Sequence, residues 1–271
     1  MADPYAAAKS KFTQETAGFP ECKCPPAKVP LDEWCDLVKH KPPKEVEKSM
    51  KERGVDLQNI DKAKGDINLD YYTVNIDKMP VIDGHTMTPD ELLTHIRMNP
   101  DDFFDPDNSD FDFYDDIDAT RWASDDPLGS LFNINFWLGP LQAEDGSVIA
   151  TLITNRRWIF TTVDTWGDFE HPVSGNREFG FLDLGDGTVI FYTRGADRLT
   201  GISDASVNWL TKRLTGGMGV AFMGADRLWQ GYQKRIADFV NANGGKATIG
   251  DKLSQRVDYD KIKKLCGGKG K

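Results

Sequence analysis

Apolar and polar residues alternate along the middle of the chain, and this alternation predicts an antiparallel sheet over about residues 131–200. The first strand begins at Leu131, and every second residue from Phe132 to Leu138 is a large apolar one, as in a strand with one buried face. Further strands are predicted at 148–154, 158–163, 178–184 and 188–194. Glu144-Asp145-Gly146 is predicted to turn between the first two strands. Asp186-Gly187 is typical of a hairpin turn between the last two.

Helical periodicity predicts the elements on either side of this sheet. A helix over 226–243 carries Trp229, Tyr232, Ile236 and Val240 on one face and is expected to close the sheet. Thr88 and Glu91 form a capping box that begins another helix, which Pro100 is expected to end. Other predicted elements are helices at 31–39, 45–53 and 203–214 and a strand at 71–76. Together they predict an α+β protein whose N-terminal region is mostly helical or irregular.

Charge is distributed unevenly and suggests four segments. These are a polar arm at 1–30, a helical or irregular region at 31–126, a sheet-and-helix domain at 127–245 and a basic tail at 246–271. Within the second segment, residues 101–126 contain eleven Asp and a single basic residue, Arg121, but also six aromatic residues. We expect this acidic segment to pack its aromatic side chains against the sheet. The basic tail is interpreted as a solvated, frayed terminus, with contact to an anionic surface as the alternative.

The overall charge and the N-terminus limit the classes of partner. A net charge of −10 makes nucleic acid a poor partner, because an acidic protein repels phosphate. No run approaches the ~20 apolar residues that a membrane span needs. The first twenty residues lack the apolar run of a signal peptide, so we expect a cytoplasmic protein, with leaderless export left open. A protein partner would bind through 1–30 or 246–271. No P-loop or G-x-G-x-x-G occurs, and we predict no cofactor.

The chain has four cysteines, which are too few for a disulfide scaffold in a protein of 271 residues. Cys22, Cys24, Cys35 and His40 offer zinc ligands, but their spacing does not match the common structural zinc patterns. We therefore predict no metal site and expect these cysteines and Cys266 to be free thiols.

The acidic segment offers a second, weaker metal pattern. Asp105, Asp107, Ser109 and Asp116 fall at positions 1, 3, 5 and 12 of an EF-hand loop. Position 6 should be glycine but is Asp110. An acidic solvated face is the simpler interpretation, and calcium binding is the alternative.

Candidate chemistry gathers between Thr165 and Arg198. His171 is the only histidine of the sheet region, and Ser174 lies three residues away, so this pair is a candidate general base and nucleophile. The simpler alternative is that His171 hydrogen-bonds the backbone of its loop. Arg177 and Arg194 are candidates for holding a carboxylate or phosphate, and pairing with Asp168, Glu170 or Asp197 is the alternative.

Aromatic residues on the strands and on the closing helix form a candidate pocket lining. The residues are Trp158, Phe160, Phe179, Phe181, Phe191, Trp229 and Tyr232. Aromatic residues at strand and helix spacing line apolar pockets between a sheet and a helix, but they also form ordinary cores.

The run from Trp158 to Arg198 resembles part of a bacterial branch of the START-like, helix-grip superfamily. The matching features are Gly167, His171, Pro172, Ser174, Gly175, Phe179, Asp186-Gly187 and Phe191, followed by the helix from Asp226. The resemblance covers about residues 131–243, and residues 1–125 have no counterpart in it. It implies a curved sheet that holds a helix over an apolar cavity, and it implies no particular reaction.

Three functional hypotheses follow from these features. The first is binding of a small apolar or amphipathic ligand between the sheet and the closing helix, with Arg177 or Arg194 at its polar end. The second is a hydrolase-type enzyme that uses His171, delivered as a secretion-system effector or toxin. The third is a structural or adaptor protein that acts through its arm and its tail.

Overall fold

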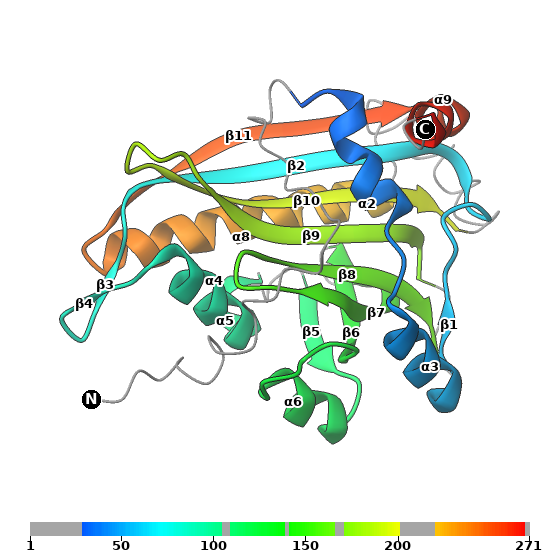
Figure 1. The fold of residues 1–271 in the computed structure, drawn as a ribbon, viewed down its shortest axis with the longest axis horizontal. Helices are drawn as coiled ribbons and strands as arrows, with labels where there is room; N and C mark the ends of the chain where they lie inside the picture. Colours follow the sequence, from blue (N-terminus) through cyan, green and yellow to red (C-terminus); the bar gives the residue numbers. More distant parts are fainter. Residues whose placement is uncertain (1–28, 105–108, 139–140, 166–170, 201–219, 269–271) are drawn as a thin grey trace.

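The sheet is the centre of the computed structural model, which describes residues 29–104, 109–138, 141–165, 171–200 and 220–268. Nine strands of these residues pair antiparallel in the order β11-β2-β10-β9-β8-β7-β6-β5, with β1 on β8 (Figure 1). Their bounds are β1 Asp56–Leu57, β2 Lys64–Lys78, β5 Ser109–Phe113, β6 Leu131–Leu138, β7 Leu141–Ile153, β8 Arg157–Asp164, β9 Val173–Asp183, β10 Val189–Leu199 and β11 Lys246–Val257. The short strands β3 (Val81–Ile82) and β4 (His85–Thr86) form a separate hairpin.

Helices cover both faces of the sheet. The helices are η2 Leu31–Trp34, α2 Cys35–Lys39, α3 Lys44–Arg53, α4 Pro89–Met98, α5 Pro100–Phe103, α6 Asp116–Trp122, α8 Val220–Ala242 and α9 Tyr259–Gly267. The long helix α8 runs along one face, and α2 lies across the other (Figure 1). We refer to these as the α8 face and the α2 face. No helix among the described residues is long and apolar enough to cross a membrane.

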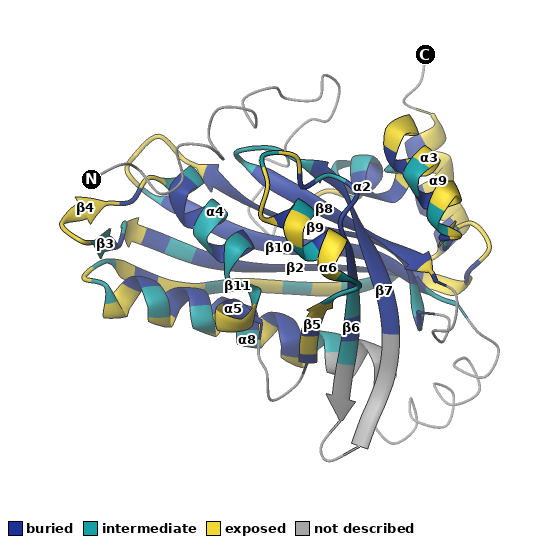
Figure 2. Cartoon of the chain, turned by 90° about the horizontal axis from the view of Figure 1, so that it is seen from below, coloured by how far each residue is buried: buried dark blue, intermediate teal, exposed yellow. Residues whose placement is uncertain are grey.

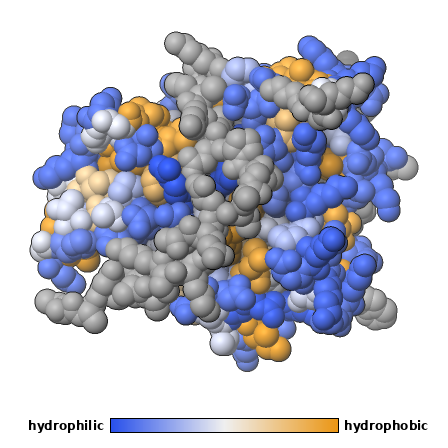
Figure 3. Space-filling view, in the orientation of Figure 1, coloured by the Kyte–Doolittle hydropathy of each residue, from blue (hydrophilic) through white to orange (hydrophobic). Residues whose placement is uncertain are grey.

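Each face has its own hydrophobic core. On the α8 face, Phe104, Trp122, Phe179 and Trp229 belong to one large aromatic cluster that joins α4, α5, α6 and α8 to the sheet. On the α2 face, η2, α2 and α9 pack a second cluster on the sheet. Since both faces are covered, β8, β9 and β10 are buried almost throughout, as Figure 2 shows for the middle of the sheet. The surface seen in Figure 3 is mostly hydrophilic, with small separate hydrophobic patches.

The structure confirms the predicted fold class. It is an α+β protein with a large antiparallel sheet and the predicted closing helix, and α4 begins with the predicted capping box of Thr88 and Glu91. Pro100 begins the short helix α5. The strand predicted at 71–76 is longer than expected, because β2 spans 15 residues and lies between β10 and β11. The helix predicted at 203–214 lies outside the described residues.

Two predicted irregular segments are strands. The turn predicted at Glu144-Asp145-Gly146 is wrong, because these residues pair with β6 in the middle of the β7 strand. Gly146 is needed there for packing, since a Cβ at this position would overlap the ring of His171. The segment Ser174–Arg177, predicted as a loop, begins β9 and pairs with β10.

The predicted basic tail is part of the folded protein. Residues 246–257 form β11, which pairs with β2 at the edge of the sheet, and α9 follows with Tyr259 and Ile262 buried. The expectation of a frayed terminus is therefore wrong. Charged side chains of β11 are exposed along this edge strand. Exposed charges on an edge oppose the pairing of further strands.

The expectation of free thiols is wrong for two of the four cysteines. Cys35 of α2 and Cys266 of α9 form a disulfide although 231 residues separate them in the sequence. Cys35 is therefore not a zinc ligand, and Cys22 and Cys24 lie outside the described residues. No cluster of metal-ligating side chains occurs in the part of the chain that the structure describes.

The acidic segment packs against the sheet as expected. Phe103, Phe104, Phe111 and Trp122 are buried on the α8 face. The proposed calcium loop is not supported, because Ser109 begins strand β5 and pairs with Phe136 of β6. Asp105 and Asp107 lie outside the described residues.

Candidate functional site

The predicted ligand site lies between the sheet and α8, where the structure contains a cavity of about 70 Å³. We call it the α8 cavity. Its lining comes from strands β5 to β10, from the segment before β9 and from α8. The lining residues are Phe111, Ile134, Val148, Phe160, Thr162, His171, Val173, Gly175, Asn176, Arg177, Phe179, Asp197, Ala225 and Trp229. Its wall is therefore mostly apolar, with a few ionisable groups at one side.

His171 is held rigidly at the edge of this cavity. Its Nδ1 accepts a hydrogen bond from the backbone N–H of Val173, 3.2 Å away. Its carbonyl oxygen accepts hydrogen bonds from Nε2 of Gln58 and Oγ1 of Thr200. Burial lowers the pKa of His171 to about 4, so the ring is neutral at neutral pH. The backbone contact predicted as the simpler alternative for this histidine is thus present.

Arg177 is engaged by protein groups rather than left open for an anion. Its Nη2 donates to both carboxylate oxygens of Asp70, at 2.8 and 2.9 Å, and lies 3.5 Å from Oδ2 of Asp197. Its guanidinium also stacks on Trp229, 4.0 Å from the ring centroid. The pairing alternative for Arg177 therefore holds for Asp197, whereas Asp168 and Glu170 lie outside the described residues. Asp70 is a further partner that the sequence did not suggest.

The carboxylates of Asp70 and Asp197 share the single guanidinium of Arg177, and this excess of negative charge affects the pKa of Asp197. Burial and the neighbouring charge of Asp70 raise the pKa of Asp197 to about 7 in spite of Arg177. Burial also raises the pKa of Asp70. The polar side of the α8 cavity is therefore acidic in character, and it presents a carboxyl group that is protonated in part of the molecules near neutral pH.

The predicted aromatic lining residues all lie on the α8 face. Phe160, Phe179 and Trp229 border the α8 cavity. Trp158, Phe181, Phe191 and Tyr232 belong to the same cluster but fill the core around it. The indole Nε1 of Trp229 is buried and has no hydrogen-bond partner among the described residues. A buried donor without an acceptor is costly, and the indole Nε1 atoms of Trp34 and Trp158 also have no partner among the described residues.

The other two predicted site residues lie elsewhere. Arg194 is fully buried on the α2 face, where its Nε donates to Glu178 at 3.1 Å and its Nη1 donates to the carbonyl of Glu33. Burial would raise the pKa of Glu178, but Arg194 and Arg157 outweigh it and hold that pKa below its usual range. Ser174 is absent from the described lining of the α8 cavity. The structure therefore brings together His171, Arg177 and Trp229, but neither Ser174 nor Arg194.

No family model matches the sequence, and no curated protein matches it. Solved structures with a similar course of sheet and helix include the di-domain ARO/CYC StfQ from the steffimycin biosynthetic pathway, at 8% identity and a TM-score of 0.40. That match covers 72% of this chain but only 56% of StfQ. The Zhui aromatase/cyclase from Streptomyces sp. R1128 has 12% identity and a TM-score of 0.41, over 66% of this chain and 99% of its own. Human STARD10 has 7% identity and a TM-score of 0.37, over 77% and 85%.

Proposed function

We propose that the chain binds a small amphipathic ligand in the α8 cavity. The observation that carries the proposal is a cavity with aromatic walls that is lined by Trp229, a residue whose buried N–H has no partner among the described residues. A hydrogen-bond acceptor on the ligand would satisfy this donor, and the apolar part would contact Phe160 and Phe179.

The size of the α8 cavity limits what enters it. A cavity of roughly 150 Å³ holds one benzene molecule, so 70 Å³ admits a group of only a few non-hydrogen atoms. The proposal therefore concerns a small neutral molecule or the polar end of a longer one. Because Arg177 is already paired with Asp70 and Asp197, a neutral acceptor such as a carbonyl oxygen suits the cavity better than an anion.

The indole resonances of the protein report directly on this interaction. We would titrate the full chain with 2-alkanones of increasing length and follow the tryptophan Nε1–H signals by NMR, with Trp229→Phe to assign the relevant one. The Trp229 signal is expected to shift and to saturate, because its N–H would then donate to the ketone oxygen.

Two substitutions on the same helix provide the control. Ala225 lines the α8 cavity, whereas Ala242 at the end of α8 is exposed. Ala225→Phe is expected to abolish the shift and Ala242→Phe to leave it intact. An unchanged Trp229 signal in the parent chain, or equal shifts in both variants, would overturn the proposal.

A further inference from the structure

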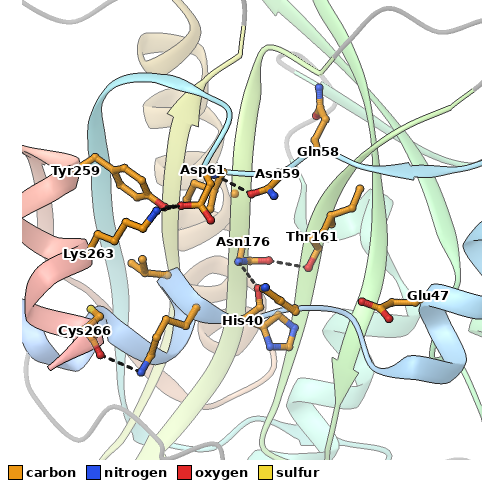
Figure 4. A pocket seen from close by; sticks show the side chains of 17 residues that line it. His40, Glu47, Gln58, Asn59, Asp61, Thr161, Asn176, Tyr259, Lys263 and Cys266 are labelled. Atoms are coloured by element: carbon orange, nitrogen blue, oxygen red, sulfur yellow. Dashed lines mark hydrogen bonds and ion pairs between the residues drawn. The ribbon is translucent and has the colours of Figure 1, made fainter. Parts of the chain in front are cut away.

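A second and larger cavity, of about 540 Å³, opens on the α2 face, on the other side of the sheet from the α8 cavity. We call it the α2 pocket. It lies where α2, the segment Leu57–Asp61 and α9 surround the middle of β8 and β9 (Figure 4). Its volume is in the range of small-molecule sites, which is roughly 300–1,000 Å³. No local pattern in the sequence indicates this pocket, because segments that line it come from opposite ends of the chain.

The floor of the α2 pocket is fixed by a network of hydrogen bonds. Asn176 of β9 accepts a hydrogen bond from Oγ1 of Thr161 at 2.7 Å and donates to the carbonyl of Leu37 at 2.8 Å. Thr161 is bonded in turn to Thr151, and Thr151 to Nε2 of His40. A floor that is already ordered loses little conformational freedom when a ligand binds.

One wall of the α2 pocket is fixed covalently. Cys266 and Gly267 of α9 line the pocket, and Cys266 is bonded to Cys35 of α2. Nζ of Lys39 also donates to the carbonyl of Cys266. The relative position of α2 and α9 is therefore held by a covalent bond as well as by noncovalent contacts.

Gln58 connects the wall of the α2 pocket to the segment before β9. The side chain is 8% exposed, and its Nε2 donates to the carbonyl of His171 at 3.1 Å. Its Oε1 is buried and has no hydrogen-bond partner among the described residues. Because this atom is buried, Gln58 shapes the wall of the pocket without presenting its oxygen to the open space.

The charges around the α2 pocket favour an anion. Its lining contains Lys39, Lys41 and Lys263 against Glu47 and Asp61, which is a net charge of +1 in a protein of net charge −10. Asp61 is already bonded to Lys263, at 2.6 Å, and to the hydroxyl of Tyr259. Lys41 is exposed, and its charge helps Lys263 to lower the pKa of Asp61. The lining thus has a small excess of positive charge in a chain whose net charge is negative.

We propose that the α2 pocket binds a small organic anion that has an apolar body. The apolar body would contact Val38, Leu57 and Ile60, which line the pocket beside its polar floor. The anionic group would lie near Lys39, Lys41 and Lys263. The pocket opens on the other side of the sheet from the α8 cavity, and Gly175 and Asn176 of β9 line both.

The proposal is tested with a pair of probes that differ in charge. The dye 8-anilinonaphthalene-1-sulfonate has an apolar body, an N–H donor and a sulfonate, and N-phenyl-1-naphthylamine is its uncharged counterpart. Fluorescence titrations of the full chain are expected to give a saturable one-site curve for the sulfonate and weaker binding of the amine.

Substitution of two neighbouring glycines locates the site. Gly267 lines the α2 pocket and a Cβ there would meet nothing within 4 Å, whereas Gly268 does not line it and a Cβ there makes only ordinary contacts. Gly267→Trp is expected to raise the dissociation constant of the sulfonate about tenfold or more, equivalent to about 1.4 kcal/mol. Gly268→Trp is expected to leave it unchanged.

A charge reversal tests the anion requirement separately. Lys41→Glu is expected to weaken binding of the sulfonate about three- to tenfold and to spare the amine, in line with the strength of exposed charge interactions. Lys51→Glu, on the exposed side of α3 and outside the pocket, is the control.

The outcomes separate the two sites of the protein. Loss of sulfonate binding in Gly267→Trp but not in Ala225→Phe supports the α2 pocket, whatever the ketone titration shows. If Gly267→Trp and Lys41→Glu both bind the sulfonate as tightly as the parent chain does, the proposal is overturned. Binding abolished only by Ala225→Phe would also overturn it, because the dye would then occupy the α8 cavity.

Discussion

The imidazole ring of His171 occupies the space that a side chain at residue 146 would need. A Cβ on Gly146 would overlap three ring and side-chain atoms of His171. Gly146 lies in β7, and His171 lies just before β9. Because Gly146 has no side chain, the segment that contains His171 can pack against β7 and close over the α8 cavity.

This relationship predicts a specific pairwise coupling. Gly146→Ala is expected to destabilise the protein by about 1–3 kcal/mol, as overpacking of a core does. His171→Ala should remove the clash, so the double variant is expected to be more stable than the two single effects added together. Urea unfolding of the four proteins measures the coupling. Strict additivity would show that the two residues do not compete for this space.

The ionisable cluster at the α8 cavity predicts a dependence of stability on pH. The pKa of Asp197 is about 7 in the folded protein and 3.8 in its ordinary state, so the folded protein binds more protons between these values. The contribution of Asp197 to stability therefore falls as the pH rises from about 4 to about 7, and is constant above that.

Asp197→Asn isolates this contribution, because it keeps the shape of the side chain but cannot ionise. The difference in unfolding free energy, variant minus parent, is expected to increase with pH up to about 7. The contributions of His171 and His40, whose pKa values burial lowers to about 4, are present in both proteins and cancel in the difference. Chemical unfolding at several pH values gives the two curves, and parallel curves would contradict the shift.

Arg194 is predicted to be a structural residue. It is fully buried and bonded to Glu178, which is also fully buried, so Arg194→Met leaves that carboxylate with Arg157, 3.7 Å away, as its remaining cation. We expect a loss of about 3–5 kcal/mol in unfolding free energy, partly recovered in the double variant with Glu178→Met. The exposed pair Lys234–Asp238 on α8 is the control, and Lys234→Met there should cost about 0.5 kcal/mol or less. A small effect of Arg194→Met with loss of ligand binding would instead favour a role in a site.

The disulfide predicts that stability depends on oxidation state. Replacing Cys35 and Cys266 by serine is expected to lower the unfolding free energy by about 2–5 kcal/mol, since the bond closes most of the chain into one loop. Peptide mapping without reductant should recover the two cysteines on linked peptides. Rapid labelling of both by iodoacetamide in the native, unreduced protein would show that the bond does not form.

Local patterns predicted the elements that short-range interactions define. The capping box of Thr88 and Glu91 is an interaction within one helical turn, and it is present. Glu144-Asp145-Gly146 has the same composition as a turn, but its glycine is required by His171, 25 residues further on. Composition alone does not distinguish these two uses of glycine.

The polar partners were harder to predict because they come from distant parts of the chain. Asp70 lies between Leu69 and Tyr71 in the buried run of β2, and a carboxylate at such a position was a signal that a buried cation would face it. Its partner Arg177 is 107 residues away. The α2 pocket depends on the contact between α2 and α9, which no local pattern indicates.

The position of β2 has a consequence for the synthesis of the protein. This strand pairs only with β10 and β11, so both of its edges await strands that begin at Val189 and Lys246. At a translation rate of roughly 5–20 residues per second, Lys78 precedes its first partner by roughly 5–20 seconds. During that interval an apolar strand emerges from the ribosome without either neighbour. The nascent chain therefore needs protection of this segment, by its own early helices or by a chaperone, before the sheet can close around it.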